Sequence, residues 1–334
     1  MQRKPLSLTV LFFLIFAIAI AQNQPRKKVG VVLKGGGAKG FAHIGALKVL
    51  EEAGIPIDYI AGTSMGAIVG GLYAVGYDAN KLDSISRVQD WLFLLSDNTA
   101  RENLPPQLKD ASERYLVSLP YRVELKKRSG KLSLPTGMIM GQNLYSLLLN
   151  LTIGYQDNMN FDDLPIPFGC IAADIRTGKE VALREGMLAQ AMRASMAIPG
   201  LFAPVEIDSM LLIDGGIVNN YPVDLVKAMG ADVVIGVTLL PDKNGKEKNK
   251  ESLVEVISGL SNFLDKQQKE EENIRNTDIL ITADTHPYRM LDFEKNAIDT
   301  IILRGEKAAR EKWDELMALK TSLGITESDS LRQT

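Results

Sequence analysis

Two strand–turn–helix units follow each other directly near the start of the chain, and this repeat limits the folds that the chain can adopt. Lys28 to Lys34 is typical of a short buried strand, Gly35 to Gly40 forms a glycine-rich turn, and Phe41 to Ala53 carries apolar residues at helical spacing. Asp58 to Ala61 predicts a second strand, and Ala67 to Val75 predicts a buried helix. Successive units of this kind indicate a parallel sheet, because each helix returns the chain to the same edge.

The same alternation of strand and helix patterns continues along the rest of the chain. Strand patterns follow at Pro167–Ile175, Glu180–Leu183, Leu211–Ile213, Asp232–Leu239 and Asp278–Ala283, and helical patterns at Gln142–Leu151, Met187–Ser195, Val223–Met229, Ser252–Arg275 and Ile298–Lys320. Residues 90–133 show neither pattern clearly, and we interpret them as an insertion over the sheet edge. We therefore predict an α/β fold, a three-layer α/β/α sandwich with a mostly parallel central sheet.

The first 21 residues have the three parts of a signal peptide. Basic residues come first, an unbroken apolar run extends from Leu6 to Ile20, and a small-residue site ends at Ala21. The apolar run is shorter than the ~20 residues that a membrane-spanning helix needs. We expect cleavage after Ala21 and export, to the periplasm, the outer membrane or the medium. The expected organisation is a signal peptide at 1–21, one domain at 22–323 and a polar tail at 324–334.

Charge and cysteine content exclude one partner class and one source of stability. The formal net charge is −3 and the pI is about 5.6, without the excess of Lys and Arg that nucleic-acid binding requires. Cys170 is the only cysteine, so no disulfide can form within the chain and core packing must stabilise the fold. Its apolar neighbours favour a buried, small hydrophobic side chain.

The second turn carries a serine in a characteristic setting. Gly62-Thr63-Ser64-Met65-Gly66 fits the Gly-x-Ser-x-Gly nucleophile elbow, in which a tight turn between strand and helix exposes the hydroxyl. Small residues are needed at both flanks because strand and helix approach too closely for a Cβ. The alternative is a structural turn in which Ser64 only caps the helix.

The first turn is a run of six small or flexible residues, Gly35-Gly36-Gly37-Ala38-Lys39-Gly40. Its spacing satisfies a dinucleotide-binding fingerprint, but the acidic residue expected at the far end of the second strand is replaced by the serine elbow, and Asp58 lies at the strand's beginning. A phosphate-binding Walker motif fails too, because no Lys followed by Ser or Thr ends the run. We interpret the run as a set of backbone N–H groups that stabilise an oxyanion.

A carboxylate followed by two glycines ends a later strand. Asp214-Gly215-Gly216 follows the strand pattern of Leu211–Ile213, and sites in parallel sheets form at the carboxyl ends of strands. The alternative is an Asx turn, which Asp-Gly sequences often form.

A serine hydroxyl needs a neighbouring base, and the chain offers few. His43 lies in the first turns of the helix after the glycine run, where it is better placed to bond a carbonyl than to reach Ser64. His286 gives the order Ser, Asp, His of an α/β-hydrolase triad, but Ser64 follows only the second strand, earlier than that fold generally places it. We favour a dyad in which Asp214 takes the proton from Ser64 directly, which requires a site that excludes solvent.

These three motifs together resemble the patatin-like phospholipases, in particular their exported bacterial branch. The resemblance covers about Lys28 to Ala283, and Ala194–Pro199 and Asn219–Pro222 add to it. It implies a patatin-like fold and a serine acyl hydrolase that cleaves phospholipids or lysophospholipids through an acyl-serine intermediate. Catalytic residues would be Ser64 and Asp214, the glycine run 35–40 would be the oxyanion hole, and no cofactor or metal would be needed.

The resemblance also bears on partners and leaves alternatives open. The expected partner is a phospholipid or another acyl-ester lipid, met at a membrane surface to which the protein binds peripherally, and a homodimer is possible. Leu144, Leu147, Leu148 and Leu151 lie at helical spacing and either pack in the core or line an acyl-chain groove. The rival functions are a lipid-binding protein without turnover and a triad esterase that uses His286.

Overall fold

A mixed, mostly parallel β-sheet forms the middle layer of the protein in the computed structural model, which describes residues 26–98, 139–240 and 267–325. Within these residues the strands lie in the order β10-β9-β1-β2-β4-β8-β7, with β5 also paired to β4. Their bounds are β1 Val29–Leu33, β2 Tyr59–Thr63, β4 Phe168–Asp174, β5 Glu180–Leu183, β7 Val205–Ile207, β8 Met210–Asp214, β9 Val233–Leu239 and β10 Ile279–Ala283. The predicted α/β class with a mostly parallel sheet is confirmed.

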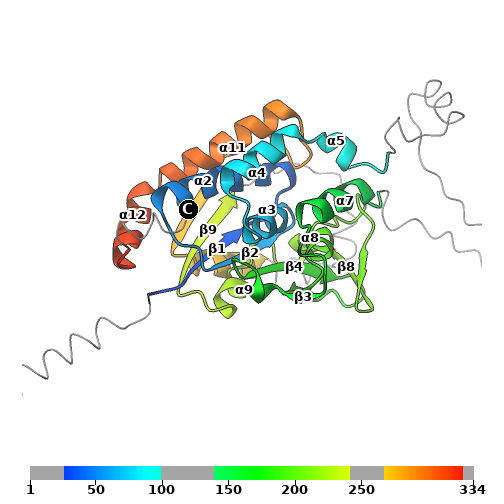
Figure 1. The fold of residues 1–334 in the computed structure, drawn as a ribbon, viewed down its shortest axis with the longest axis horizontal. Helices are drawn as coiled ribbons and strands as arrows, with labels where there is room; N and C mark the ends of the chain where they lie inside the picture. Colours follow the sequence, from blue (N-terminus) through cyan, green and yellow to red (C-terminus); the bar gives the residue numbers. More distant parts are fainter. Residues whose placement is uncertain (1–25, 99–138, 241–266, 326–334) are drawn as a thin grey trace, which may run out of the picture.

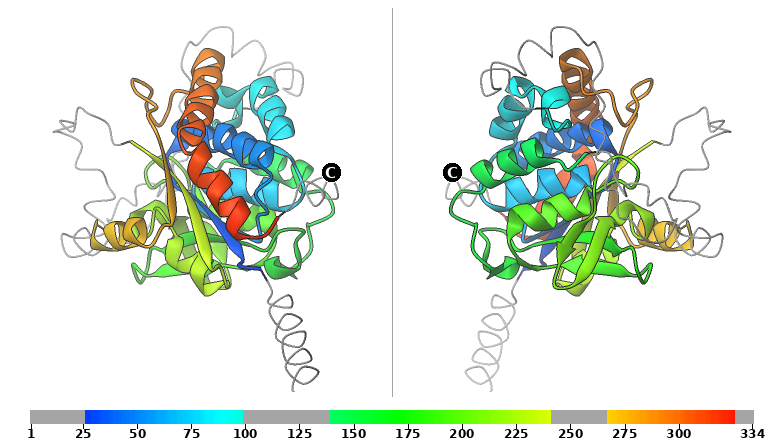
Figure 2. Two further views of the ribbon diagram at one scale, coloured as in Figure 1. Left: turned by 90° about the vertical axis from the view of Figure 1, so that its left-hand side faces the viewer. Right: turned by 90° about the vertical axis from the view of Figure 1, so that its right-hand side faces the viewer.

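Helices cover both faces of this sheet (Figures 1 and 2). On one face lie α2 Ala42–Ala53, α3 Met65–Ala74, α4 Ala79–Val88, α8 Leu188–Ser195 and α11 Lys295–Arg310, and on the other lie α9 Val223–Ala228 and the helical segment 267–275. Short helices α5 Trp91–Leu94, α7 Gln142–Leu151 and α12 Trp313–Ser322, single turns η1 Gly37–Phe41, η3 Phe161–Asp163 and η4 Gly215–Ile217, and a two-stranded sheet of β3 Met159–Asn160 and β6 Glu185–Gly186 complete the described part.

Alternating side chains of the strands pack into two separate cores. Val31 and Leu33 of β1 belong to a large core under α2, α3 and α11, whereas Val32 belongs to a smaller core with α9. All three are fully buried. A strand that is buried on both faces has a continuous run of apolar residues. This explains why apolar and polar residues do not alternate in the sequence of β1.

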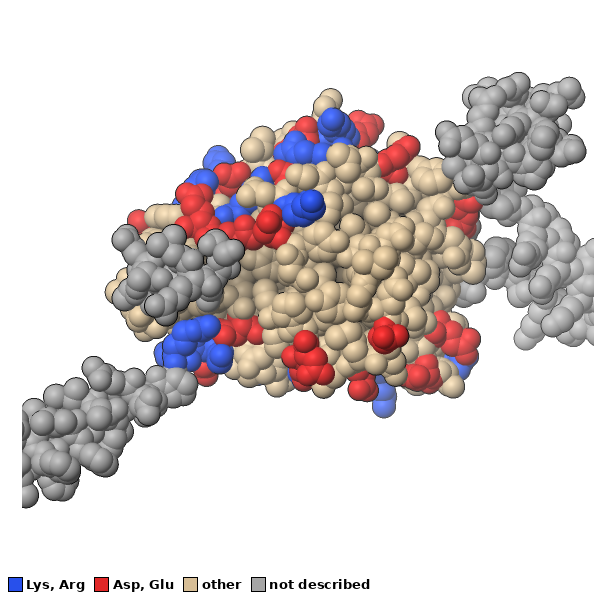
Figure 3. Space-filling view, viewed as in Figure 1, with Lys and Arg blue, Asp and Glu red and all other residues tan. Residues whose placement is uncertain are grey.

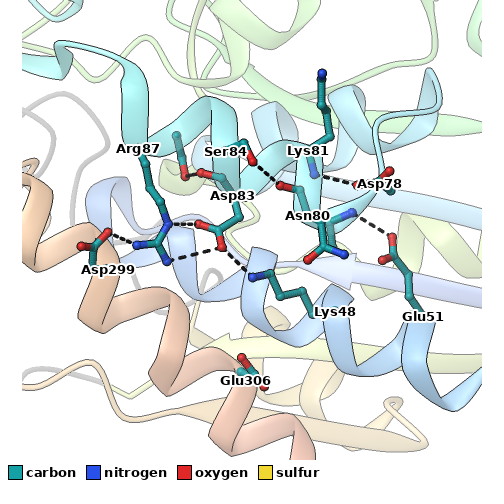
Figure 4. Close-up of polar contacts among 12 residues, drawn as sticks. Lys48, Glu51, Asp78, Asn80, Lys81, Asp83, Ser84, Arg87, Asp299 and Glu306 are labelled. Carbon is teal, nitrogen blue, oxygen red and sulfur yellow. Dashed lines mark hydrogen bonds and ion pairs between the residues drawn. The ribbon is translucent and has the colours of Figure 1, made fainter.

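An ion-pair network holds three helices of the larger layer together (Figure 4). Asp83 of α4 accepts from Lys48 of α2 at 2.5 Å and pairs with Arg87, which also reaches Asp299 of α11. Burial alone would raise the pKa of Asp83, but the hydrogen bonds from Arg87 and Lys48 hold it below its usual value. The network therefore links α2, α4 and α11 to one another.

Two sequence predictions differ from the structure. The strand β8 runs antiparallel to β4, so the prediction that Asp214 ends a parallel strand is wrong. The pattern of Ile298–Lys320 predicted one long helix, but the chain forms α11 and α12 with a break at 311–312. The chain bends at this break, and α12 packs against α2 with Leu316 buried in the large core (Figures 1 and 2).

Several sequence predictions lie outside the described residues. These are the signal peptide at 1–21, most of the insertion at 90–133, the first part of Ser252–Arg275 and nearly all of the tail. Among the helices of the described part, none has the length and apolar character that crossing a bilayer requires.

Candidate active site

Ser64 sits in a strained turn between β2 and α3. Its backbone angles are φ 56° and ψ −121°, a region that non-glycine residues rarely adopt and that costs roughly 1–3 kcal/mol. The turn is tight because a Cβ on Gly66 would collide with the carbonyl of Leu33, and one on Gly62 would collide with the backbone of Gly66. The prediction that both flanking positions need glycine is therefore confirmed, and the local geometry is that of a nucleophile elbow.

A second serine, Ser195 of α8, holds this turn in place. Its hydroxyl accepts the N–H of Ser64 at 3.0 Å and donates to the carbonyl of Ile171 at 2.6 Å. Ser195 is fully buried, and Ser64 is only 5% exposed. Ser195 lies in the segment 194–199 that contributes to the family resemblance, but its role could not be predicted from the sequence, because its partner lies 131 positions away.

We predict that Ser195→Ala weakens both the fold and the proposed activity. Alanine leaves the buried N–H of Ser64 without an acceptor, which should lower the free energy of unfolding by roughly 1–3 kcal/mol. The freed turn should also misplace the Ser64 hydroxyl and lower kcat by roughly 10- to 100-fold. Urea unfolding and ester hydrolysis would measure the two effects.

Thr152→Val is the matched control for this substitution. The Thr152 hydroxyl is also buried, and it donates only to the carbonyl of Leu148 within the same helix. This variant should lose some stability and keep the wild-type kcat. Equal kcat values for Ser195→Ala and Thr152→Val would show that Ser195 does not position Ser64.

The glycine run packs against Ser64, and its backbone N–H groups divide into two sets. The N–H of Gly35 donates to Asn220 at 3.1 Å, and that of Ala38 donates to Met290 at 2.8 Å. Lys39 and Gly40 lie inside the η1 turn, where bonds to the third residue back use the amides, whereas Gly37 is the first residue of η1 and its amide has no partner within the turn. Outside the helices and strands of the described residues, no backbone carbonyl accepts from Gly36 or Gly37. Of the six predicted residues, these two therefore have the amides best placed for a ligand.

The ring of His43 is hydrogen-bonded to Lys34, the residue just before the glycine run. Its Nε2 lies 2.6 Å from the carbonyl oxygen of Lys34, so Nε2 carries the proton and donates. The ring is fully buried, and burial lowers its pKa to about 4 although the bond to Lys34 opposes this shift. The expectation that His43 bonds a nearby carbonyl is confirmed.

The lowered pKa of His43 predicts a loss of stability in mild acid. Because the folded pKa is below the unfolded value of 6.5, the unfolded state binds the extra proton, and stability falls as the pH drops from about 6.5 towards 4. Between pH 7 and pH 5 this contributes a loss of about 2 kcal/mol. His43→Gln should lack this part of the loss in chemical unfolding curves, whereas His286→Gln should retain it. Identical acid losses in wild type and His43→Gln would contradict the assignment.

Asp214 ends β8 beside the elbow although that strand is antiparallel. Thr63 pairs with Ile171 of β4 and Asp214 pairs with Ala172, so the ends of β2 and β8 lie at nearly the same level on either side of β4. Asp214 Oδ1 accepts the N–H of Gly216 at 2.7 Å, which is the Asx-turn bond of the alternative interpretation. The same bond fixes the orientation of the carboxylate and does not prevent it from acting as a base. Asp214 is only 7% exposed.

Asn220 links the glycine run to the Asp214 turn. The backbone carbonyl of Asn220 accepts the N–H of Gly35, and the side-chain amide of Asn220 donates to the Gly35 carbonyl at 3.3 Å. A Cβ on Gly35 or on Gly216 would meet the Asn220 side chain, so both glycines allow it to fit between the two turns. In the sequence, Asn219–Pro222 contributes only to the family resemblance, and nothing there indicates this role of Asn220.

One open cavity brings half of the predicted site residues together. It is lined by Ser64, Asp214, Gly35, Gly36, Gly37, Lys39 and Gly216, with the cationic Lys34 and the carboxylate of Glu270 on its wall. The other predicted residues do not line it; these are Ala38, Gly40, Gly62, Thr63, Met65, Gly66 and Gly215. The Thr63 hydroxyl instead donates to the carbonyl of Asn219 at 2.9 Å. His286 does not line it either. Within the described residues, no group of His, Cys, Asp and Glu is arranged to hold a metal ion.

Ser64 also lines a second, apolar pocket. This pocket, a small cavity of ≈ 30 Å³, is bounded by side chains such as Met65, Ile68, Trp91 and Leu144. Ser64 therefore stands between a polar cavity on one side and an apolar one on the other.

The chain is similar to a family of known proteins. Residues 31–227 match the family model described as patatin-like phospholipase. An uncharacterised NTE family protein of Mycobacterium tuberculosis is 32% identical over 224 residues, which are 67% of this chain and 52% of that protein. Human patatin-like phospholipase domain-containing protein 6 is 33% identical over 211 residues, 63% of this chain and 13% of that protein. The chain thus spans about half the length of its mycobacterial relative.

Among solved structures, similar chains are found at low sequence identity. VipD from Legionella pneumophila has a TM-score of 0.45 and 18% identity, over 87% of this chain and 67% of that chain. Human GIVD cytosolic phospholipase A2, in complex with methyl gamma-linolenyl fluorophosphonate and terbium chloride, has a TM-score of 0.45 and 12% identity, over 92% of this chain and 62% of that chain.

Proposed function

Since this chain belongs to the patatin-like phospholipase family, a family of lipid acyl hydrolases, we propose that it hydrolyses the acyl esters of phospholipids or lysophospholipids at Ser64. The observation that carries this proposal is the position of Ser64 between the polar cavity and the apolar pocket. An acyl ester of a lipid has the same division, with a polar alcohol part on one side of the carbonyl and a hydrocarbon chain on the other. Lys39 adds positive charge to the polar side, which suits a phosphate-bearing head group, whereas the charge of Lys34 is paired with that of Glu270 on the same wall.

In the proposed first step, Asp214 acts as the base. It takes the proton from the Ser64 hydroxyl while Oγ attacks the ester carbonyl, whose π electrons move to the carbonyl oxygen. Both residues line the same cavity, which supports this role. The bond from Gly216 keeps the carboxylate in a fixed orientation.

The negative charge that develops on the carbonyl oxygen needs hydrogen-bond donors. We assign this role to the N–H groups of Gly36 and Gly37, because Gly35 and Ala38 donate to Asn220 and Met290, and Lys39 and Gly40 lie inside η1, of which Gly37 is only the first residue. One such donor contributes roughly 3 kcal/mol to the stability of the transition state.

Collapse of the tetrahedral intermediate completes acylation. The alcohol oxygen leaves, takes the proton held by Asp214, and Ser64 retains the acyl group as an ester. A water molecule then attacks this ester, giving its proton to Asp214, and the Ser64 oxygen leaves with that proton. The products are a fatty acid, an alcohol-bearing lipid and the free enzyme.

The proposed cellular setting follows from the signal-peptide pattern at residues 1–21, which predicts an exported protein that meets lipid at a membrane surface. The face over α3, α7 and α8 carries few charged side chains, whereas Lys, Arg, Asp and Glu gather towards α2, α4 and α11 and around the rim (Figure 3). Met140 and Ile153, which flank α7, are 59% and 71% exposed. Such a surface is suited to peripheral contact with a bilayer.

Incubation of the protein with vesicles of mixed phospholipids and lysophospholipids tests the proposal. We expect the release of free fatty acid, detected by mass spectrometry, and the blocking of this release by an alkyl fluorophosphonate that modifies Ser64. Peptide mapping should find the adduct at that residue alone. Lipid binding without any fatty acid release or adduct would support the lipid-binding alternative instead.

A further inference from the structure

A loop between β10 and α11 packs directly on the glycine run. We call its residues 284–293 the covering loop. The backbone carbonyl of Met290 in this loop accepts the N–H of Ala38 at 2.8 Å. Gly37 has a φ of 55°, and a Cβ on it would collide with the same carbonyl, so the two backbones are in close contact. The covering loop lies outside residues 31–227, which match the family model.

The glycine run is held at two points. The N–H of Gly35 donates to the carbonyl of Asn220 at 3.1 Å, and the N–H of Ala38 donates to the covering loop. The N–H groups of Gly36 and Gly37, to which we assign the oxyanion, lie between these two points. Because a glycine backbone has few steric limits, the directions of these two N–H groups depend on the bonds at either end.

Arg304 of α11 holds the covering loop. Its Nη1 donates to two backbone carbonyls of the loop, that of Asp284 at 3.0 Å and that of His286. Its guanidinium lies 5.7 Å from the centre of the Tyr288 ring, within the range of a cation–π contact. One side chain therefore contacts three positions just before Met290. Arg304 lines neither the polar cavity nor the apolar pocket, so it lies outside the space that a substrate would occupy.

Two further contacts hold the part of the loop around Met290. The carboxylate of Asp292 accepts the N–H of Arg289 at 2.8 Å, which closes a short turn with Met290 inside it. The ring of Phe293 lies edge-on to that of Phe41 at 6.1 Å between centroids. Phe41 is the last residue of η1, so the covering loop is packed on the glycine run at this point too.

We propose that Arg304 is a positioning residue for the oxyanion amides, acting through the covering loop and the carbonyl of Met290. The inference rests on the proposed function for the reaction. The helix that carries Arg304 is itself packed against η1 and α2. Without the bonds from Arg304, the carbonyl of Met290 shifts and the peptide between Gly37 and Ala38 turns with it. The amides then no longer point at the charge that develops on the substrate.

Arg304→Met tests this role, because methionine keeps an unbranched apolar chain and removes the donors. We expect kcat for p-nitrophenyl butyrate to fall at least ~10-fold, since a small displacement of catalytic groups has a large effect on rate. KM should change by less than ~2-fold, because substrate contacts are retained. The matched control is Arg310→Met on the same helix, where Arg310 pairs with Glu52 and Glu306 instead. A similar fall of kcat in Arg310→Met would overturn the proposal.

A short alkyl trifluoromethyl ketone reports on the oxyanion directly. Oγ of Ser64 adds to its carbonyl carbon, Asp214 takes the hydroxyl proton, and the carbonyl oxygen becomes an oxyanion. In Arg304→Met the inhibition constant should rise by the same factor by which kcat/KM falls. The alcohol made by reducing the ketone cannot form the oxyanion and should bind both proteins equally. An unchanged inhibition constant for the ketone would overturn the proposal.

Asp292→Ala loosens the same loop and leaves Arg304 in place. The bond that it removes lies on the protein surface, so this variant should fold. Both kcat and the affinity for the ketone should fall ~3-fold, because the turn around Met290 is less well held. Wild-type values of both quantities in Asp292→Ala would overturn the proposal, whether or not Arg304→Met folds.

Hydrogen exchange separates this inference from the proposed function, because it needs no substrate. In Arg304→Met the N–H of Ala38 should exchange faster than in the wild type and in Arg310→Met, since its acceptor moves. Mass spectrometry of peptides that cover residues 35–40 would measure this. Faster exchange in a protein that hydrolyses no ester would support the role of Arg304 in holding the run and refute the hydrolase. Ester hydrolysis with unchanged exchange would overturn the inference alone.

Discussion

Replacing Ser64 with alanine should lower kcat for ester hydrolysis by at least ~10⁴-fold, because no other group in the cavity would form the acyl intermediate. The fold should survive. Alanine adopts the φ of 56° at about the same cost as serine, and the N–H that Ser195 accepts is retained. The free energy of unfolding should therefore change by less than about 1 kcal/mol. Stopped assays with p-nitrophenyl butyrate and urea unfolding curves would measure the two quantities.

The matched control for this loss is Ser84→Ala. Ser84 lies on α4, where its hydroxyl donates to the carbonyl of Asn80 on the protein surface. This variant should keep the wild-type kcat in the same assay. Residual hydrolysis by Ser64→Ala within tenfold of wild type would show that another residue is the nucleophile.

The local parts of this site could be predicted from the sequence. Apolar periodicity gave the strands and helices around the first two turns, and the glycine spacing identified the elbow, because each depends on neighbours within a few residues. Gly62 and Gly66 meet backbone atoms of their own strand, turn and helix or of the adjacent β1, as expected for a tight strand-to-helix crossing.

The distant contacts could not be predicted in the same way. Periodicity reports that Leu211–Ile213 is a strand, but it carries no information on direction, and the antiparallel pairing of β8 with β4 depends on the path of the preceding loop. Ser195 and Asn220 act on the elbow and on the glycine run from 131 and 185 positions away. A serine and an asparagine are common residues, and only the fold shows which backbone groups they reach.

The position of Asp214 has a consequence for the choice of base. Because β8 is antiparallel, its last residue reaches the level of Ala172 in β4, next to the residue of β4 that pairs with the end of β2. The side chain then lines the same cavity as Ser64, whereas His286 does not and the ring of His43 is held by Lys34. Geometry thus favours the carboxylate over either histidine as the proton acceptor.

Asp214→Asn should accordingly lower kcat by roughly 10³-fold with little effect on stability. Asparagine has the same shape, and its Oδ1 can still accept the N–H of Gly216, but an amide cannot take the proton from Ser64. Loss of a general base typically costs 10²- to 10⁴-fold. Intact-mass measurement should accompany the assay, to show that the new amide next to Gly215 has not reverted to the acid.

Two further variants serve as a control for Asp214→Asn and as a test that distinguishes the dyad from the triad. Asp174→Asn makes the same change at the end of β4, where the carboxylate accepts from Thr177 and lies outside the cavity, so kcat should stay at the wild-type value. His286→Ala should also stay fully active if the dyad operates. Loss of activity in His286→Ala would instead support the triad, because the imidazole would then be the group that carries the proton.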